Sequence, residues 1–157
     1  MPDYLTSREL FARLMPQKEP MLMLDGIVAC DTASESGICG LTVGLHPMAA
    51  LEEDGSLPSY ALMEVMAQSS AAILSYCHHL TSPDGAFLTQ GVILAVRNCV
   101  FHVAPVIPRG TEILVRTATE YSGGSLRRAR IRAEEAGIGR ILSEALFSVM
   151  ILETGGV

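Results

Sequence analysis

The longest apolar stretch of the chain, residues 58–80, predicts one long helix. Apolar side chains occur nearly all round this stretch and small residues fill its middle, which indicates a helix enclosed on most of its sides. At about 1.5 Å per residue it would be roughly 33 Å long. Glu64, Gln68 and the pair His78-His79 interrupt the run, so the pattern favours a buried helix over a membrane span.

The residues before this helix predict a short helix, two strands and a loop. Thr6-Ser-Arg-Glu9 indicates a capping box, in which the first and last side chains satisfy free amides at a helix start. Residues 21–30 and 37–44 are predicted strands, the first with a bulge or bend at Gly26. Residues 45–57 predict a loop, and loops of this length inside a compact domain are often functional.

The residues after the helix alternate between apolar and polar side chains, which predicts strands. We expect them at residues 91–97, 99–103, 111–121, 126–133 and 140–152, with turns at 122–125 and 136–137. In the fourth of these strands Arg128, Arg130 and Arg132 share one face. A sheet wrapped around one central helix is the simplest packing of these parts, so we expect a single α+β domain over residues 1–157.

The composition indicates a globular protein whose apolar surface is partly covered. Hydrophobic residues make up 49% of the chain and charged residues only 18%, which is lightly charged for a free-standing monomer. We therefore expect another subunit or a greasy ligand to cover part of the surface. The net charge of −6 argues against a nucleic-acid partner, which would normally require a basic excess.

The four cysteines, Cys30, Cys39, Cys77 and Cys99, form no C-x-x-C pair and have no zinc-ligand spacing. With no signal peptide at the start of the sequence, they indicate buried free thiols in a reducing compartment. We therefore expect a cytoplasmic protein. No metal-ligand cluster or phosphate-binding glycine loop is present in the sequence, so we expect no metal and no dissociable cofactor.

Glu64 is the only Asp, Glu, Lys or Arg between Gly55 and Pro83. An ionised carboxylate on so apolar a helix is costly unless it is paired. A carboxyl group in such surroundings is suited to general acid catalysis. The alternative is an acid near the helix start that faces solvent and is favoured by the helix dipole.

Three segments resemble the bacterial 3-hydroxyacyl-acyl-carrier-protein dehydratases. The helix start, Leu57-Pro58-Ser59-Tyr60-Ala-Leu-Met-Glu64-Val-Met-Ala-Gln68, resembles that family's central-helix motif, in which a Pro six residues before the catalytic Glu opens the helix. Residues 14–25 resemble its opening Leu-x-Pro-His-x-x-Pro segment, and residues 91–97 resemble its third-strand region. The wording of the helix start is most similar to the divergent branch encoded with aryl polyene pigment pathways.

This resemblance implies a hotdog fold that is dimeric and has thioester tunnels at the subunit interface. It also implies dehydration of a 3-hydroxyacyl chain, held on the phosphopantetheine of acyl carrier protein, to a trans-2-enoyl thioester. In that reaction a His removes the α-proton, while the Glu of the partner's helix protonates the departing hydroxyl. Glu64 would take the acid role. The match gives supporting or substrate-binding roles to Gln68, Pro58, Ser59, Tyr60 and Arg97.

The sequence departs from the family pattern at its histidines. The catalytic His of the family lies 14 residues before the Glu, and that position is Ala50 here. Gln17 stands where the opening segment would carry a His. His46, in the predicted loop, is the best replacement as the catalytic base. His78 and His79 lie about 21 Å or more along the helix from Glu64, too far to share its site.

Three functions therefore stay open at this stage. The first is an active dehydratase of fatty-acid or polyene biosynthesis, working as a homodimer or a heterodimer. The second is a catalytically weak or silent hotdog subunit that pairs with an active dehydratase, because the His is displaced. The third is a hotdog thioesterase, which also carries an acid on this helix. The face of Arg128, Arg130 and Arg132 either contacts an acidic carrier protein or faces water.

Overall fold

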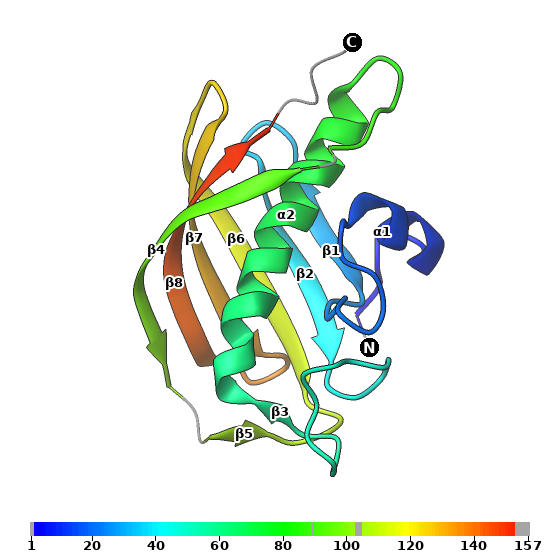
Figure 1. The fold of residues 1–157 in the computed structure, drawn as a ribbon, viewed down its shortest axis with the longest axis vertical. Coiled ribbons are helices and arrows are strands. Elements are labelled where there is room, and N and C mark those ends of the chain that lie inside the picture. The colour runs from blue at the N-terminus through cyan, green and yellow to red at the C-terminus, as the bar shows by residue number, and fades with distance from the viewer. Residues whose placement is uncertain (1, 89, 103–104, 153–157) are drawn as a thin grey trace.

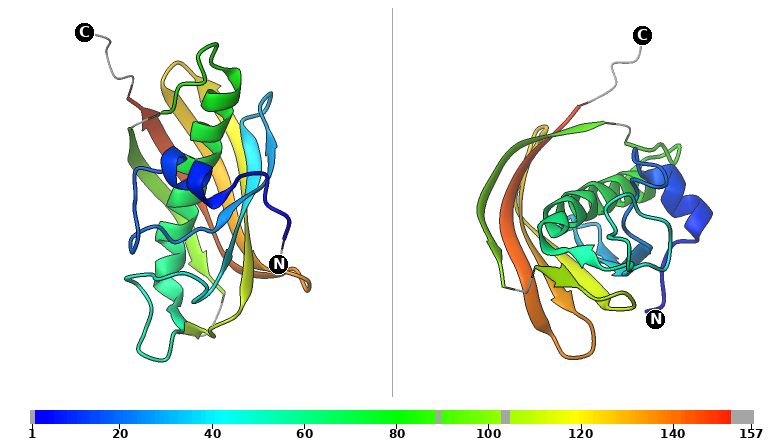
Figure 2. Two further views of the ribbon diagram at one scale, coloured as in Figure 1. Left: turned by 90° about the vertical axis from the view of Figure 1, so that its right-hand side faces the viewer. Right: turned by 60° about the horizontal axis from the view of Figure 1, so that its bottom comes forward.

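A computed structural model describes residues 2–88, 90–102 and 105–152. Its main feature is a six-stranded antiparallel sheet in the order β1-β2-β6-β7-β8-β4, which curves around the long helix α2 (Figures 1 and 2). The strands are β1 (Gly26–Asp31), β2 (Ser36–Thr42), β4 (Gly91–Phe101), β6 (Glu112–Gly123), β7 (Leu126–Glu135) and β8 (Arg140–Ile151). The remaining elements are α1 (Arg8–Leu14), β3 (Leu57–Pro58), a 3₁₀ turn (Ser59–Ala61), α2 (Leu62–Thr81) and β5 (Val106–Ile107). The predicted α+β hotdog architecture is confirmed.

The core lies between α2 and the concave face of the sheet. Strand side chains alternate between the two faces, so Ala129, Ile131 and Ala133 of β7 are buried beneath the helix. Polar contacts also join the two layers, because the hydroxyls of Ser69 on α2 and Thr117 on β6 lie 3.0 Å apart. The small residues predicted for the middle of the helix thus let it pack closely against the sheet.

The start of α2 differs from the sequence expectation. We predicted a helix from residue 58, but Pro58 is extended and pairs with Val106 in the two-stranded sheet β3-β5. The backbone amide of Ser59 donates to the carbonyl of Pro105 at 2.9 Å, and the α-helix begins only at Leu62. Residues 58 and 59 therefore pair with the distant segment 105–106 instead of extending the helix.

The N-terminal elements differ in a similar way. Ser7, rather than Thr6, caps α1 and accepts a hydrogen bond from the amide of Leu10 at 3.1 Å. The Thr6 hydroxyl lies 3.4 Å from the amide of Ile27 instead. The predicted strand 21–30 is shorter at its start, because β1 begins at Gly26, and its irregularity lies just after Ile27. Both differences arise because residues before β1 bond to distant partners.

Strand β4 forms one edge of the sheet and leaves apolar side chains uncovered. The two predicted strands 91–97 and 99–103 form one strand in the structure, with register shifts, as far as Phe101; residue 103 lies outside the described residues. The exposed apolar side chains on this strand are Val92, Ile93, Leu94, Val100 and Phe101. An exposed apolar edge strand can accept another strand or sheet.

Arg128, Arg130 and Arg132 of β7 lie on the convex face of the sheet, and all three are exposed. Arg130 pairs with Glu120 at 2.9 Å, and Arg132 lies 3.6 Å from Glu144. The guanidinium of Arg128 lies over the ring of Tyr121. The three side chains are exposed in the single chain, and contact with a carrier protein stays a prediction. Within the described residues no helix is long and apolar enough to cross a membrane.

Candidate active site

A groove runs along α2 between the helix and the edge strand β4. It consists of two hollows that share Glu64, Ala67 and Ile93. We call the hollow toward the C-terminal end of α2 the upper hollow; it is lined by Leu14, Pro16, Gln17, Glu64, Ala67, Ser70, Ala71, Leu74, Ser75, Leu88, Gln90, Gly91, Val92, Ile93, Val149, Met150 and Ile151.

The other, which we call the lower hollow, has a volume of about 470 Å³ and falls within the usual range of small-molecule sites. Its lining consists of Pro20, Met21, Met23, Ala49, Ala50, Tyr60, Ala61, Met63, Glu64, Ala67, Ile93, Val96 and Phe147. The two hollows together form one apolar groove, and Glu64, where they meet, is the one carboxylate among its described lining residues.

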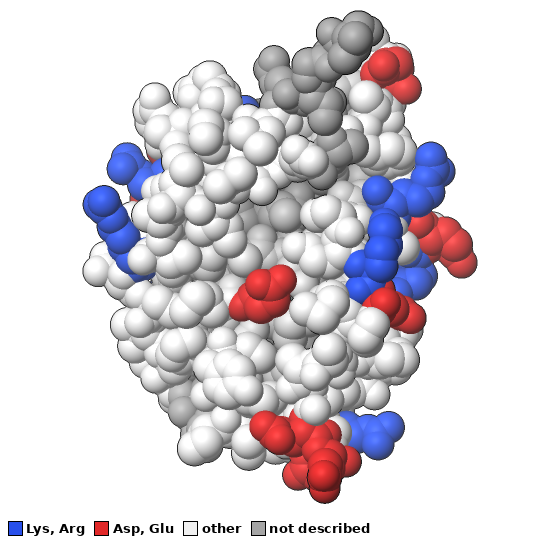
Figure 3. All heavy atoms as spheres, viewed as in Figure 1, with Lys and Arg blue, Asp and Glu red and all other residues white. Residues whose placement is uncertain are grey.

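Glu64 lies in the first turn of α2 and is exposed in the single chain. Figure 3 shows one acidic side chain in the middle of a largely uncharged area, with the other charged side chains toward the margins of the view. Glu64 is the only Asp, Glu, Lys or Arg of α2. The enclosure that we predicted for the helix is therefore incomplete. The sheet of this chain wraps around one side of α2 (Figure 2), and Met63 and Glu64, which line the lower hollow, are exposed.

Gln68 holds Glu64 and an upstream segment in place. The side chain is 1% exposed, and its Nε2 donates to Glu64 Oε1 and to the carbonyl of Met21, both at 2.9 Å. Its Oε1 accepts a hydrogen bond from the amide of Met23 at 2.9 Å. All the donors and one acceptor site of the amide are thus used, and its orientation is fixed. In the structure Gln68 positions the candidate acid.

The structure places only some of the other predicted substrate-binding residues in the groove. Tyr60 lines the lower hollow and is 71% exposed. Pro58 is buried in β3, and Ser59 bonds through its backbone to the β5 segment. Arg97 is exposed on β4 and lines neither hollow. Its neighbour Val96 does line the lower hollow.

His46 lies outside both hollows, beside Asp25. Its Nε2 is 3.7 Å from Asp25 Oδ1, and Asp25 Oδ2 accepts a hydrogen bond from the amide of Thr42 at 2.6 Å. Burial raises the pKa of the Asp25 carboxyl above its ordinary value, while the Thr42 amide and His46 lower it. The structure therefore gives His46 a local partner at the end of the β1–β2 pair and does not bring it together with Glu64 within one chain.

The position that resembles the family's His is on the groove itself. Ala50 lines the lower hollow together with Glu64. The described linings of both hollows contain no His, Lys or Cys. The remaining histidines have other contacts: His79 bonds to the carbonyl of Gly85 at 2.7 Å, and His102 lies 3.8 Å from Glu144. A carboxyl group thus faces the groove without a base from its own chain.

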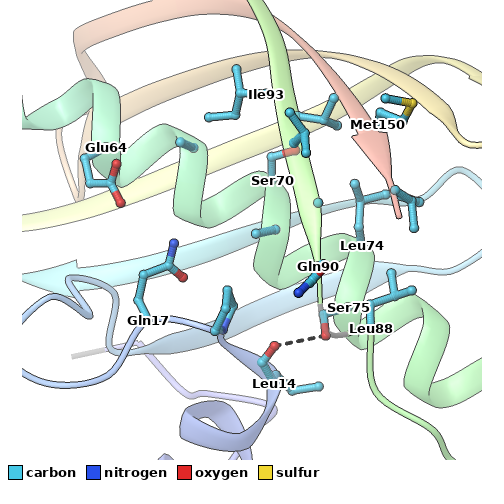
Figure 4. A pocket seen from close by; sticks show the side chains of 17 residues that line it. Leu14, Gln17, Glu64, Ser70, Leu74, Ser75, Leu88, Gln90, Ile93 and Met150 are labelled. Atoms are coloured by element: carbon cyan, nitrogen blue, oxygen red, sulfur yellow. Dashed lines mark hydrogen bonds between the residues drawn. The ribbon is translucent and has the colours of Figure 1, made fainter. Parts of the chain in front are cut away.

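Two groove residues were not predicted from the sequence. The hydroxyl of Ser70 and Oε1 of Gln17 are both buried without a hydrogen-bond partner in the described structure. They approach the upper hollow from α2 and from the segment after α1 respectively (Figure 4). Gln17 did show a sequence signal, since it replaces a His of the family motif. Ser70 gave none, because a serine within an apolar helix has the same pattern whether its hydroxyl is paired or free.

The described residues contain no cluster of side chains that could bind a metal ion. Nowhere in residues 2–88, 90–102 and 105–152 do three or more His, Cys, Asp or Glu side chains come together as a metal site would require. All four cysteines are free thiols. Among the described lining residues, the polar side chains of the groove are one carboxyl group, two amides and three hydroxyls.

A long helix wrapped by an antiparallel sheet, with an acid in its first turn facing a groove, defines a hotdog-fold protein. The profile of the ApeP-like family, described as ApeP dehydratase, matches residues 10–150, so the chain belongs to the ApeP-like family of dehydratases. A search of curated proteins finds no match.

Solved structures share the fold. The dehydratase heterocomplex ApeI:P from Xenorhabdus doucetiae is 19% identical with a TM-score of 0.76, covering 92% of this chain and 91% of that one. Thioesterase superfamily member 2 from Mus musculus is 16% identical with a TM-score of 0.64, covering 92% and 94%. The protein smu.793 from Streptococcus mutans UA159, bound to acetyl CoA, is 12% identical with a TM-score of 0.60, covering 88% and 95%.

Proposed function

We propose that the chain dehydrates 3-hydroxyacyl thioesters to trans-2-enoyl thioesters, with the acyl group held on the phosphopantetheine of an acyl carrier protein. The observation that carries the proposal is the position of Glu64, the one carboxyl group among the described lining residues of an apolar groove, held by Gln68 at 2.9 Å. Membership of the ApeP-like dehydratase family supports the reaction type. We assign this activity to polyene biosynthesis, as the family resemblance of the helix start implies.

In the proposed reaction Glu64 is the general acid. A base removes a proton from the carbon next to the thioester carbonyl, and the electron pair forms the new double bond as the hydroxyl on the third carbon departs. The Glu64 carboxyl donates its proton to that hydroxyl, which leaves as water. Gln68 donates to one carboxyl oxygen and so leaves the other to hold the proton toward the groove. The base then passes its proton to solvent and Glu64 regains one.

The base, in this proposal, comes from a second hotdog subunit. Ala50 supplies no base to the groove, and a second copy of this chain would bring the same Ala50. The exposed apolar strand β4 provides a surface that a second sheet would cover. A heterocomplex is also the form in which the ApeI:P dehydratase of Xenorhabdus doucetiae is described. We therefore favour a heterodimer whose other subunit contributes a His.

The lack of a base in the groove also favours a second candidate, a catalytically silent subunit that only stabilises its partner. Ala50 and the position of His46 leave this chain without a base, as a silent subunit would be. The two candidates differ in what Glu64 does. Under the first the carboxyl group is required for turnover, and under the second it is not.

The test is a dehydration assay on the purified complex of this chain with a hotdog dehydratase subunit that carries the catalytic His. Loss of water from a 3-hydroxyacyl carrier thioester is followed by mass spectrometry, with wild-type chain and with Glu64→Gln. Loss of turnover in the variant complex supports the acid role. Full turnover would overturn it in favour of the silent subunit, and release of free carrier thiol would indicate a thioesterase.

A further inference from the structure

Two buried oxygen atoms in the upper hollow have no hydrogen-bond partner among the residues that the structure describes. Ser70 is 1% exposed and its Oγ is unpaired; Oε1 of Gln17 is shielded from solvent and also unpaired. Both residues line the hollow that Glu64 lines. Buried polar groups in proteins are nearly always paired, so each unpaired atom requires an explanation. A polar ligand bound in the hollow is an explanation that accounts for both unpaired atoms.

Neighbouring serines of α2 show that Ser70 differs from them. The Ser69 hydroxyl is paired with that of Thr117 at 3.0 Å, and Ser75 donates to the carbonyl of Leu14 at 3.0 Å. Those bonds join the helix to the sheet and to α1. In Figure 4 the side chain of Ser70 lies on the β4 side of α2, and that of Gln17 rises toward the helix from the segment below it. Ser70 thus faces the groove and holds no part of the fold.

The chemistry of the two atoms limits what would bind there. A serine hydroxyl donates and accepts, while a glutamine Oε1 only accepts. A secondary amide or a hydroxyl carries both a donor and an acceptor, so it has the groups that these two residues require. A plain hydrocarbon chain would leave both atoms unpaired in a buried site, and the cost of that would weaken its binding.

The spacing along the helix defines where this group would lie in the substrate. Ser70 follows Glu64 by six residues, which is about 9 Å along the helix axis. From the carbon that loses its hydroxyl, about seven bonds lead through the thioester to the first amide carbonyl of the pantetheine arm. At roughly 1.2 Å per bond in an extended chain, that path spans about 8 Å. A hydroxyl borne equally far along the acyl chain would meet the same spacing.

We propose that Ser70 and Gln17 form a hydrogen-bonding subsite for a substrate group that both donates and accepts. The inference rests on the proposed function for the identity of the substrate, with the arm's first amide and a distal acyl hydroxyl as its two sources. The subsite fixes how far the substrate slides along the groove and thereby sets the departing hydroxyl at Glu64. It makes Ser70 and Gln17 positioning residues for the reaction.

The test measures binding, with Glu64→Gln present in every chain so that substrate is not consumed. Three thioesters are compared in the complex with the partner subunit: 3-hydroxybutanoyl-N-acetylcysteamine, which has the first amide; 3-hydroxybutanoyl ethanethiol, which lacks it; and an ethanethiol thioester with a distal hydroxyl on its acyl chain. Ser70→Ala should weaken binding about tenfold for the first alone if the arm is the source, or for the third alone if the acyl chain is. If Ser70→Ala and the parent chain bound each of the three thioesters with equal affinity, the subsite would be overturned.

Two further variants keep the test interpretable. Ser69→Ala removes a neighbouring hydroxyl that is paired within the core, so it should lower thermal stability and leave the discrimination among the three thioesters unchanged. Gln17→Met should weaken the same thioester that Ser70→Ala weakens. Because the readout is binding, its outcome is separate from the proposed function, whose failure would appear as absence of water loss in the complex with Glu64 intact.

Discussion

Gln68 donates a hydrogen bond of 2.9 Å to Glu64 from one turn further along α2, and the same amide group bonds to the backbone of Met21 and Met23. The candidate acid and one wall of the groove are therefore held by a single buried side chain. This relationship gives Gln68 a role in both stability and activity, and it lets the two effects be separated by substitution.

Glu64→Gln should abolish most of the dehydration and leave the fold intact. The amide oxygen of a glutamine can still accept from Gln68, but the side chain has no proton to give to the departing hydroxyl. We expect turnover to fall by about 10²–10⁴-fold, the usual contribution of a general acid. The measurement is the rate of water loss in the purified complex, with thermal unfolding as the control. A variant that retained its rate would remove Glu64 from the chemistry.

Gln68→Leu should both destabilise the chain and lower its activity. It leaves the amide of Met23 and the carbonyl of Met21 without their partner, at a cost of about 2–3 kcal/mol in the free energy of unfolding. Gln68→Glu is the matched variant, since it can still accept from Met23 but cannot donate to Glu64 while ionised. Chemical denaturation and the turnover rate are measured side by side. Equal stability of wild type and Gln68→Leu would contradict this role.

Leu94→Glu should prevent assembly with the second subunit. Leu94 is 51% exposed on the edge strand β4, and a charge buried there in an interface would lack a partner. We expect at least about 100-fold weaker association, read by size-exclusion chromatography with light scattering. Ile138→Glu is the control, because Ile138 is 70% exposed in the turn between β7 and β8, away from that edge. Assembly that is equally strong in both variants would exclude β4 as the interface.

His46→Ala should leave the rate of water loss within about twofold of wild type. The imidazole lies outside both hollows, and at 3.7 Å from the buried Asp25 carboxylate it is too far for a direct hydrogen bond. Turnover in the complex and thermal stability are the two readouts. A large loss of turnover with unchanged stability would instead place His46 in the active site, as the sequence resemblance first indicated.

Cys39 should resist alkylation in the folded chain. Its side chain is fully buried, and burial raises the pKa of its thiol to about 12. Because the thiolate is the reactive form, only about one part in ten thousand is available near pH 8. Labelling with iodoacetamide, followed by mass spectrometry of peptides, should modify the partly exposed Cys99 first and Cys39 only in denaturant. Prompt labelling of Cys39 at neutral pH would show that the core opens readily.

Local patterns determined the central helix, the candidate acid and the strand faces. The apolar run around Glu64 and the alternation through Arg128, Arg130 and Arg132 report which side of an element is buried, because helix and strand periodicities fix where successive side chains point. These features depend on neighbours in the sequence. The helix start around Glu64 also carried the resemblance to the dehydratase family.

The tertiary structure decided which distant segments meet. Pro58 became part of a strand because Val106 lies beside it, and His46 found Asp25 rather than the groove. The unpaired hydroxyl of Ser70 became visible only once its surroundings were known. The periodicity of a sequence predicts which side chains point inward, but it does not predict which residues they contact. For this protein the sequence determined Glu64, and the three-dimensional contacts decided what surrounds it.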